Sequence, residues 1–126
     1  MNRVELKKRV GDVGTLLIRE KGYIAPVDVF MRLGLLSVKD YEAWRSGSVP
    51  YMEKVCGANL GQLSFIMSLL RENAAKENLK PSFTAYHQWG NSGKRVLRFS
   101  KYGDQKIERA YATHQVLKTV LPSVSE

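Results

Sequence analysis

Residues 25–50 read APVDVFMRLGLLSVKDYEAWRSGSVP, and this stretch decides the fold that the sequence predicts. Pro26 suits the first position of a helix, where a backbone N–H would have no partner within the helix. Apolar residues follow at helical spacing up to Gly34, which can adopt the left-handed conformation that closes a helix. Ser37, with an acidic residue three positions later, predicts the cap of a second helix that ends before Gly47. Two short helices joined by a glycine turn are therefore expected.

The second predicted helix, residues 37–46, has an apolar side and a polar side. Val38, Tyr41 and Trp44 are spaced to face inward, whereas the charged residues between them are expected to point outward. A helix, a short turn and a capped helix with a polar outer face form the layout of a helix-turn-helix, whose second helix enters the major groove of DNA. A plain helical hairpin in a small α-rich core is the alternative interpretation.

The runs Phe30–Gly34, Ser37–Trp44 and RSGSVP at residues 45–50 resemble the DNA-reading unit of the Cro and phage-repressor family. That family has a leucine-glycine turn and then a serine-capped recognition helix that closes in an aromatic or aliphatic residue, a charged pair and a glycine. The turn here is one residue longer than the usual one. The resemblance implies that these residues face DNA: Ser37, Lys39, Asp40, Glu42 and Arg45. Lys39 and Arg45 are the expected contacts to phosphates or base edges.

The overall charge predicts a polyanionic partner. The 126 residues include 20 Lys and Arg against 12 Asp and Glu, which gives a formal net charge of +8. A positive charge of this size raises the local concentration of phosphate polyanions around a protein. The excess is concentrated in residues 78–103, which contain no Asp or Glu and include Lys80, Lys94, Arg95, Arg98 and Lys101. Nucleic acid is therefore the expected partner, with DNA favoured over RNA.

The same region predicts a basic β-hairpin at residues 82–101. Its first arm, residues 82–89, is rich in aromatic residues, a Gly-Asn-Ser-Gly turn follows, and residues 94–100 are prone to form a strand. The first arm can also be read as a short helix that starts at Pro81. Arginine and lysine neutralise phosphates, and an exposed aromatic ring stacks on an unpaired base. The hairpin would act as a wing beside the helix-turn-helix, with candidate contacts at Tyr86, Lys94, Arg95, Arg98 and Lys101.

Further helices are expected at residues 3–21, 50–56, 59–78 and 104–121. Residues 59–78 carry the strongest amphipathic pattern, and the expected inward residues are Leu60, Leu63, Ile66, Met67 and Leu70. The predicted fold class is mainly α (α+β), a small helical domain with one β-hairpin that is winged helix-turn-helix-like. We expect a single domain over residues 1–121 and a flexible tail at residues 122–126.

Arg109 and His114 have a spacing that resembles the arginine and histidine of the HEPN family of ribonucleases. The resemblance implies a histidine that moves a proton and an arginine that steadies the phosphate during attack by the RNA 2′-hydroxyl. The alternative is an ordinary histidine on a helix face near the C-terminal end of that helix. The acidic residues show no paired spacing that suits metal-dependent nuclease chemistry, and no nucleophile motif is present. We therefore expect a non-catalytic DNA-binding regulator, with a small ribonuclease as one rival.

The remaining composition limits the other classes of function. A single cysteine, Cys56, and two histidines are too few for an ordinary four-ligand zinc site, so no metal and no cofactor are expected. The start of the chain lacks the apolar core of a signal peptide, and no apolar run approaches the length of a membrane span. A cytoplasmic protein without membrane contact is therefore expected. A basic adaptor for an acidic protein partner is a second rival, and a palindrome-reading helix-turn-helix would imply a homodimer.

Overall fold

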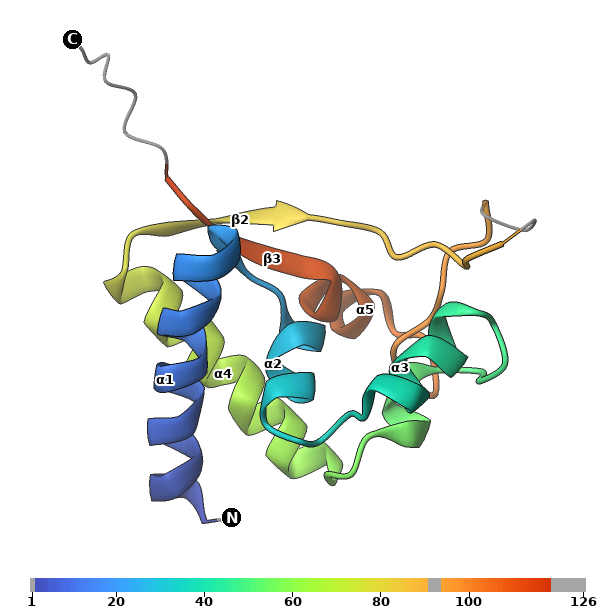
Figure 1. The fold of residues 1–126 in the computed structure, drawn as a ribbon, viewed down its shortest axis with the longest axis horizontal. Helices are drawn as coiled ribbons and strands as arrows, with labels where there is room; N and C mark the ends of the chain where they lie inside the picture. The colour runs from blue at the N-terminus through green and yellow to red at the C-terminus, as the bar shows by residue number, and fades with distance from the viewer. Residues whose placement is uncertain (1, 91–93, 119–126) are drawn as a thin grey trace, which may run out of the picture.

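The computed structural model describes residues 2–90 and 94–118, which form a mixed α+β fold (Figure 1). The helices are α1 (Arg3–Lys21), α2 (Pro26–Arg32), α3 (Val38–Arg45), the 3-10 helix η1 (Met52–Val55), α4 (Leu60–Lys76) and α5 (Gln105–Ala112). The strands are β1 (Tyr23–Ile24), β2 (Leu79–Phe83) and β3 (Thr113–Leu117). The predicted tail at residues 122–126 lies outside the described residues.

Local capping groups start and stop the two long helices. The side chain of Asn2 accepts a hydrogen bond from the Glu5 N–H at the start of α1, and Gly22 ends that helix with a φ of 80°. At the start of α4, Asn59 and Gln62 form a reciprocal capping box. Both helices were expected from their apolar spacing, although α4 ends two residues before the predicted position.

The predicted pair of short helices is also present. Pro26 occupies the first turn of α2, and Gly34 takes a φ of 79° in the turn that follows. The Ser37 Oγ accepts a hydrogen bond from the Asp40 N–H at 3.0 Å and so caps α3. The predicted helix at residues 50–56 is shorter than expected, because only the single 3-10 turn η1 forms there.

The inward side of α3 differs from the prediction at one position. Trp44 is fully buried and Tyr41 is partly buried, but Val38 is 60% exposed. With 3.6 residues per turn, Val38 lies about 120° around the helix axis from Trp44. Because Trp44 is the residue of α3 that enters the core, Val38 is turned out to solvent.

A three-stranded antiparallel sheet has the strand order β1-β3-β2. Tyr23 pairs with Val116 on one side of β3, and Leu79 to Phe83 pair along its other side. Pro81 therefore lies in an edge strand, where its missing N–H costs no hydrogen bond within the sheet. The alternative helix beginning at Pro81 is wrong.

The predicted helix at residues 104–121 is wrong at residues 113–118, and residues 119–121 lie outside the described residues. Asp104 does cap α5, through bonds from the Lys106 and Ile107 N–H groups, but the next five residues form β3. β3 is the central strand, and strands on both sides satisfy its backbone groups. This long-range pairing outweighs the helical spacing of its side chains.

The predicted hairpin at residues 82–101 is present in a narrower form. Its arms meet in one isolated antiparallel bridge between His87 and Val96. The Leu97 N–H donates to the Tyr86 carbonyl, and the Gln88 N–H donates to the Arg95 carbonyl, both at 2.8 Å. We call residues 86–97 the hairpin; residues 91–93 of its turn lie outside the described residues.

Buried aromatic rings join the helices to the hairpin. The Trp44 ring packs 5.6 Å from that of Tyr86 and 5.1 Å from that of Phe99, and its indole N–H donates to the Arg98 carbonyl at 2.8 Å. The Phe99 ring also stacks on Tyr111 of α5 at 5.6 Å. The core therefore extends without a break from α3 to α5.

Glu108 of α5 holds the segment that leaves the hairpin. Its carboxylate accepts backbone N–H bonds from Phe99 at 2.9 Å and Ser100 at 2.7 Å, together with the Ser100 hydroxyl. Phe99 and Ser100 are both buried, so these N–H groups have little access to water. A carboxylate that accepts several bonds from buried donors contributes directly to stability.

Glu108→Ala should lower the free energy of unfolding by about 1–3 kcal/mol, because it leaves buried donors without partners. Urea denaturation would measure the loss. The matched control is Glu72→Ala on the exposed face of α4, which should change stability by no more than about 0.5 kcal/mol. Equal effects of the two substitutions would contradict this role of Glu108.

Candidate nucleic-acid interface

The predicted reading helix and the predicted basic hairpin are in direct contact. The Trp89 N–H of the hairpin donates to the Arg45 carbonyl at the end of α3 at 2.7 Å. Beside it, Gly47 has a φ of 84°, and a Cβ there would come within 2.9 Å of the Gln88 side chain. A glycine at this position therefore permits the close approach of the hairpin to α3 (Figure 1).

Arg45 lies within a cluster of aromatic rings. Its guanidinium carbon is 5.0 Å from the ring centres of Tyr86 and Trp89 and 5.9 Å from that of Tyr41. Its Nη1 donates to the Tyr41 hydroxyl at 3.4 Å, while its Nε is buried without a hydrogen-bond partner. Although Arg45 was expected to point outward, most of its contacts serve to hold the hairpin against α3.

The other expected contacts on α3 are exposed, except for the half-buried Asp40. Lys39 and Glu42 face solvent, and so does Ser37, whose hydroxyl oxygen accepts the capping bond described above. On the hairpin, Lys94 and Arg95 are exposed, and Arg95 donates to the Gln88 side chain at 3.1 Å. These five residues therefore lie on two elements that touch each other.

The remaining expected contacts have different surroundings. Tyr86 is buried and its hydroxyl is engaged by a histidine, so its ring is not available to stack on a base. Arg98 is exposed, but its guanidinium donates to the carbonyls of Ser100 and Lys101 and lies 5.7 Å from the Tyr51 ring centre. Lys101 lies on a different part of the surface, at the edge of a groove beside α5.

Trp89 is a candidate contact that the sequence analysis did not select. Its side chain is 46% exposed, and the edge-on ring of Tyr41 supports it at 5.8 Å. Its place immediately before Gly90, at the tip of a predicted hairpin, is the sequence signal that predicts exposure. An exposed ring beside an arginine is the arrangement that stacks on an unpaired base.

Arg109 and His114 do not share a helix. Arg109 lies in α5, where its guanidinium carbon is 5.0 Å from the Phe83 ring centre, whereas His114 lies in β3. His114 stacks on Tyr23 at 5.0 Å, and its Nε2 lies 3.0 Å from the Tyr86 hydroxyl. The single-helix geometry expected for the ribonuclease pair is therefore wrong.

Burial lowers the pKa of His114 below its ordinary value of 6.5. The nearby Asp28 carboxylate on α2 opposes this effect, and the Lys21 ammonium on α1, which pairs with Asp28 at 3.0 Å, adds to it. His114 is thus held in its neutral form between two rings. This environment is that of a structural histidine, which joins β3 to β1 through Tyr23 and to the hairpin through Tyr86.

Cys56 has the properties of a core residue. It is partly buried, and burial, reinforced by the Glu53 and Asp40 carboxylates, raises the pKa of its thiol to about 12. A thiol with this pKa stays protonated near neutral pH and is a poor nucleophile. Within residues 2–90 and 94–118, no group of three or more metal-ligating side chains gathers, and no helix is long and apolar enough to cross a membrane.

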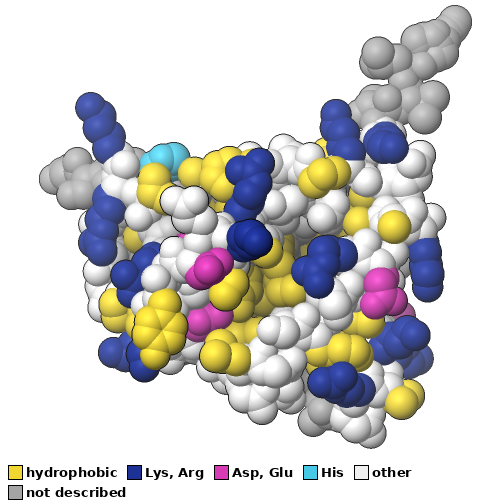
Figure 2. All heavy atoms as spheres, turned by 180° about the vertical axis from the view of Figure 1, so that it is seen from behind, with side chains coloured by type: hydrophobic (Ala, Val, Ile, Leu, Met, Phe, Trp, Pro, Cys, Tyr) yellow, Lys and Arg dark blue, Asp and Glu magenta, His cyan; other side chains and the backbone are white. Residues whose placement is uncertain are grey.

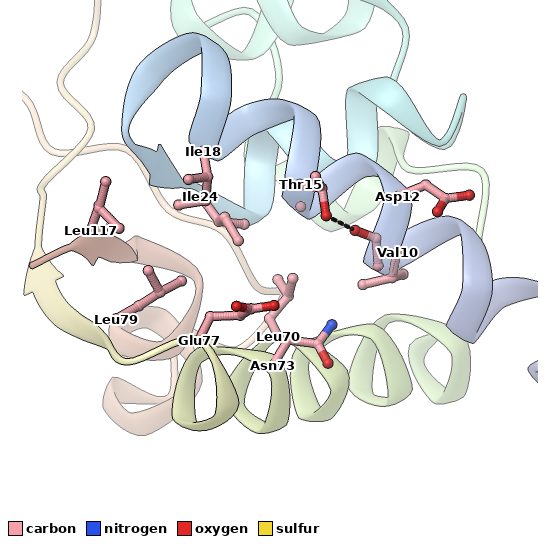
Figure 3. A pocket seen from close by; sticks show the side chains of 12 residues that line it. Val10, Asp12, Thr15, Ile18, Ile24, Leu70, Asn73, Glu77, Leu79 and Leu117 are labelled. Carbon is pink, nitrogen blue, oxygen red and sulfur yellow. Dashed lines mark hydrogen bonds between the residues drawn. The ribbon is translucent and has the colours of Figure 1, made fainter.

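A cavity of about 390 Å³ separates α1 from α4 and the sheet (Figure 3). Half of its lining residues are aliphatic, and Asn73 of α4 and Glu77, which follows α4, extend into the space between the helices. The hydroxyl of Thr15 donates to the Gly11 carbonyl of its own helix at 3.1 Å. The polar groups of this cavity come from separate turns and do not converge on one point, so it is a weaker candidate site than the α3 and hairpin surface.

A double-mutant cycle tests whether Arg45 joins the hairpin to α3. Arg45→Met and Trp89→Ala should show a coupling of about 0.5–2 kcal/mol in unfolding free energy, because each substitution removes the same cation–π contact. The control cycle pairs Arg45→Met with Tyr102→Ala, an exposed ring that lies over Lys101. The control cycle should be additive to within about 0.5 kcal/mol. An additive Arg45–Trp89 cycle would contradict the contact.

The neutral state of His114 predicts a pH dependence of stability. The unfolded chain takes up a proton near the ordinary pKa, whereas the folded chain resists it, so stability is lost as the pH falls through the lowered pKa of His114. His114→Gln keeps a hydrogen-bonding group and should reduce the loss of unfolding free energy between about pH 7.5 and about pH 5. Urea denaturation at both pH values would measure it. The control is His87→Gln in the exposed hairpin arm. This variant should lose as much unfolding free energy between the two pH values as the unchanged protein does.

The comparisons with known proteins give no relative of this chain. No protein-family model matches it, and neither the curated proteins nor the solved structures contain a significant match.

Proposed function

We propose that the protein binds nucleic acid, with duplex DNA favoured, through the surface formed by α3 and the hairpin. The observation that carries this proposal is the contact between the two elements at Arg45 and Trp89, which joins α3 directly to the hairpin. Both elements carry exposed cations. Lys39, Lys94 and Arg95 have no carboxylate partner among the described residues. The ion pairs of the described residues lie on α1 and α2 instead.

The packing of α3 supports this proposal. It packs against η1 and, through Trp44 and Arg45, against the hairpin, while Val38, Lys39 and Glu42 are exposed. An exposed helix face beside a basic hairpin is what DNA binding by a helix-turn-helix with a wing would require. Lys39 would contact a phosphate or a base edge, and the hairpin cations would contact the backbone. Arg45 would act by holding the two elements in place.

A rigid surface suits this function for a physical reason. Each phosphate that a cation neutralises releases condensed counterions, and binding becomes steeply dependent on salt. Cations that are already fixed relative to each other lose less conformational entropy when they bind than cations on separate mobile segments. The contacts of the buried Trp44 and of Arg45, which lies among aromatic rings, hold α3 and the hairpin together before binding.

Lys94→Glu/Arg95→Glu should weaken binding to a random-sequence duplex and lower the salt slope by about 0.9 for each phosphate that the variant no longer neutralises. Fluorescence anisotropy over a salt series would measure both quantities, for the duplex, its single strand and a matched RNA. The control, Lys7→Glu/Lys8→Glu, makes the same charge change on α1, at the other end of the molecule from α3 (Figure 1). Equal weakening by the two variants would contradict a specific surface.

Lys39→Ala tests the role of the helix separately. It should change the order of preference among duplex sequences while the hairpin variant weakens all of them alike. Preferential binding to the single strand, abolished by Trp89→Ala, would instead favour base stacking at the tip of the hairpin. No binding to any of the three nucleic acids would reject the proposal.

A further inference from the structure

A second surface, independent of the hairpin, follows α4 on the face shown in Figure 2. Two adjoining hollows of about 710 and 400 Å³ share Met67, Arg71 and Ala110 in their linings. The larger lies between α4 and α5, and the smaller lies between the second half of α4 and the sheet. Figure 2 shows apolar side chains in the hollow near the middle of this face, with lysine and arginine side chains around it. We call this feature the α4 groove.

Large apolar side chains stand exposed at one end of the α4 groove. Leu60 is 64% exposed, Ile107 is 46% exposed and Tyr102 is 86% exposed. Leu60 was expected to face the core, but it lies in the first turn of α4, beyond the edge of the core. Single exposed apolar side chains are common on protein surfaces, but several gathered around a hollow indicate a binding surface.

The cations and the carboxylates that line the α4 groove differ in how far other groups engage them. Arg71, Lys101 and Lys106 line it, and the described residues offer none of them an ion pair. The two carboxylates in the lining are already engaged. Glu53 accepts bonds from the Tyr111 hydroxyl at 2.7 Å and the Lys101 N–H at 3.3 Å, and Asp104 caps α5. These carboxylates keep their charge, so three cations against two carboxylates leave a small excess of positive charge, which favours an acidic group at the edges of the groove.

We propose that the α4 groove binds an acidic amphipathic helix of a partner protein. Apolar side chains at positions i, i+3, i+4 and i+7 would enter the hollow, and Asp or Glu beside them would meet Arg71, Lys101 and Lys106. From Leu60 to Ala74, α4 extends about 21 Å, which matches about four turns of a bound helix.

The walls of the groove favour a helix over an extended peptide. Along the larger hollow they are α4, α5, Glu53 of η1 and the segment at residues 100–104, none of which belongs to a strand, so an added strand would find no sheet edge to pair with. A helix satisfies its own backbone and needs only side-chain contacts. Nucleic acid would gain little from the apolar lining, which separates this surface from the α3 and hairpin surface.

A displayed library of 18-residue peptides, with a fixed leucine stripe at helical spacing and all other positions randomised, tests the proposal. Selection on the full chain should enrich Asp and Glu beside the stripe. Enriched peptides should lose about tenfold or more in affinity on Arg71→Glu/Lys106→Glu, because the charge complementarity is reversed. Leu60→Ser/Ile107→Ser should also weaken binding. Anisotropy with the labelled peptides would measure both losses.

Matched variants locate the site. Lys94→Glu/Arg95→Glu makes the same charge change on the hairpin, and Val96→Ser removes an exposed apolar side chain there, so both should keep the affinity for the peptide. Failure to enrich acidic peptides would overturn the proposal, as would peptides that bind Arg71→Glu/Lys106→Glu unchanged. Sedimentation that shows a dimer broken by Leu60→Ser/Ile107→Ser would overturn it too, because the occupant would then be a second copy of this chain.

Discussion

The attachment of α3 depends on one buried side chain, Trp44. It is the residue of α3 that is fully buried, and its indole contacts Tyr86 and Phe99 while its N–H satisfies the carbonyl of Arg98. A single tryptophan thus links the helix to the hairpin and to the segment that leaves it. The next residue, Arg45, continues the same contact outward to Trp89. Trp44 therefore holds the hairpin through contacts inside the core, and Arg45 holds it through contacts nearer the surface. The candidate interface depends on both contacts.

Elements whose ends are set by nearby residues could be predicted from the sequence. The caps at Ser37 and Asn59 and the turn at Gly34 each depend on groups within a few positions, and the structure contains all of them. β3 could not be predicted in this way, because its hydrogen-bond partners come from β1 and β2, far away in the chain. The apolar residues of α5 and β3 together have a spacing consistent with one continuous helix. The pairing of β3 with both neighbouring strands decides its conformation instead.

The same distinction applies to the candidate sites. Helical periodicity correctly places Lys39 and Glu42 on the outside of α3, because their exposure depends on the helix alone. It fails for Arg45, since the hairpin that covers this side chain lies more than forty residues further along the chain. It also fails for Leu60, which continues the apolar stripe of α4 past the point where the core ends. A pattern in one helix predicts which side is apolar, but not how far the rest of the protein covers it.

The segment from Arg98 to Lys101 connects the two surfaces. At one end, the Arg98 guanidinium donates to the carbonyls of Ser100 and Lys101. At the other end, the Lys101 N–H donates to Glu53, and both residues line the α4 groove. Between them, Glu108 fixes Phe99 and Ser100. Because both surfaces carry exposed cations without ion-pair partners among the described residues, an anionic partner bound at either one would reduce the positive potential at the other. Salt screens such an effect beyond about 8–10 Å, so it acts mainly through charges near this shared segment. The backbone bonds to Glu108 and Glu53 hold this connecting segment between the two surfaces.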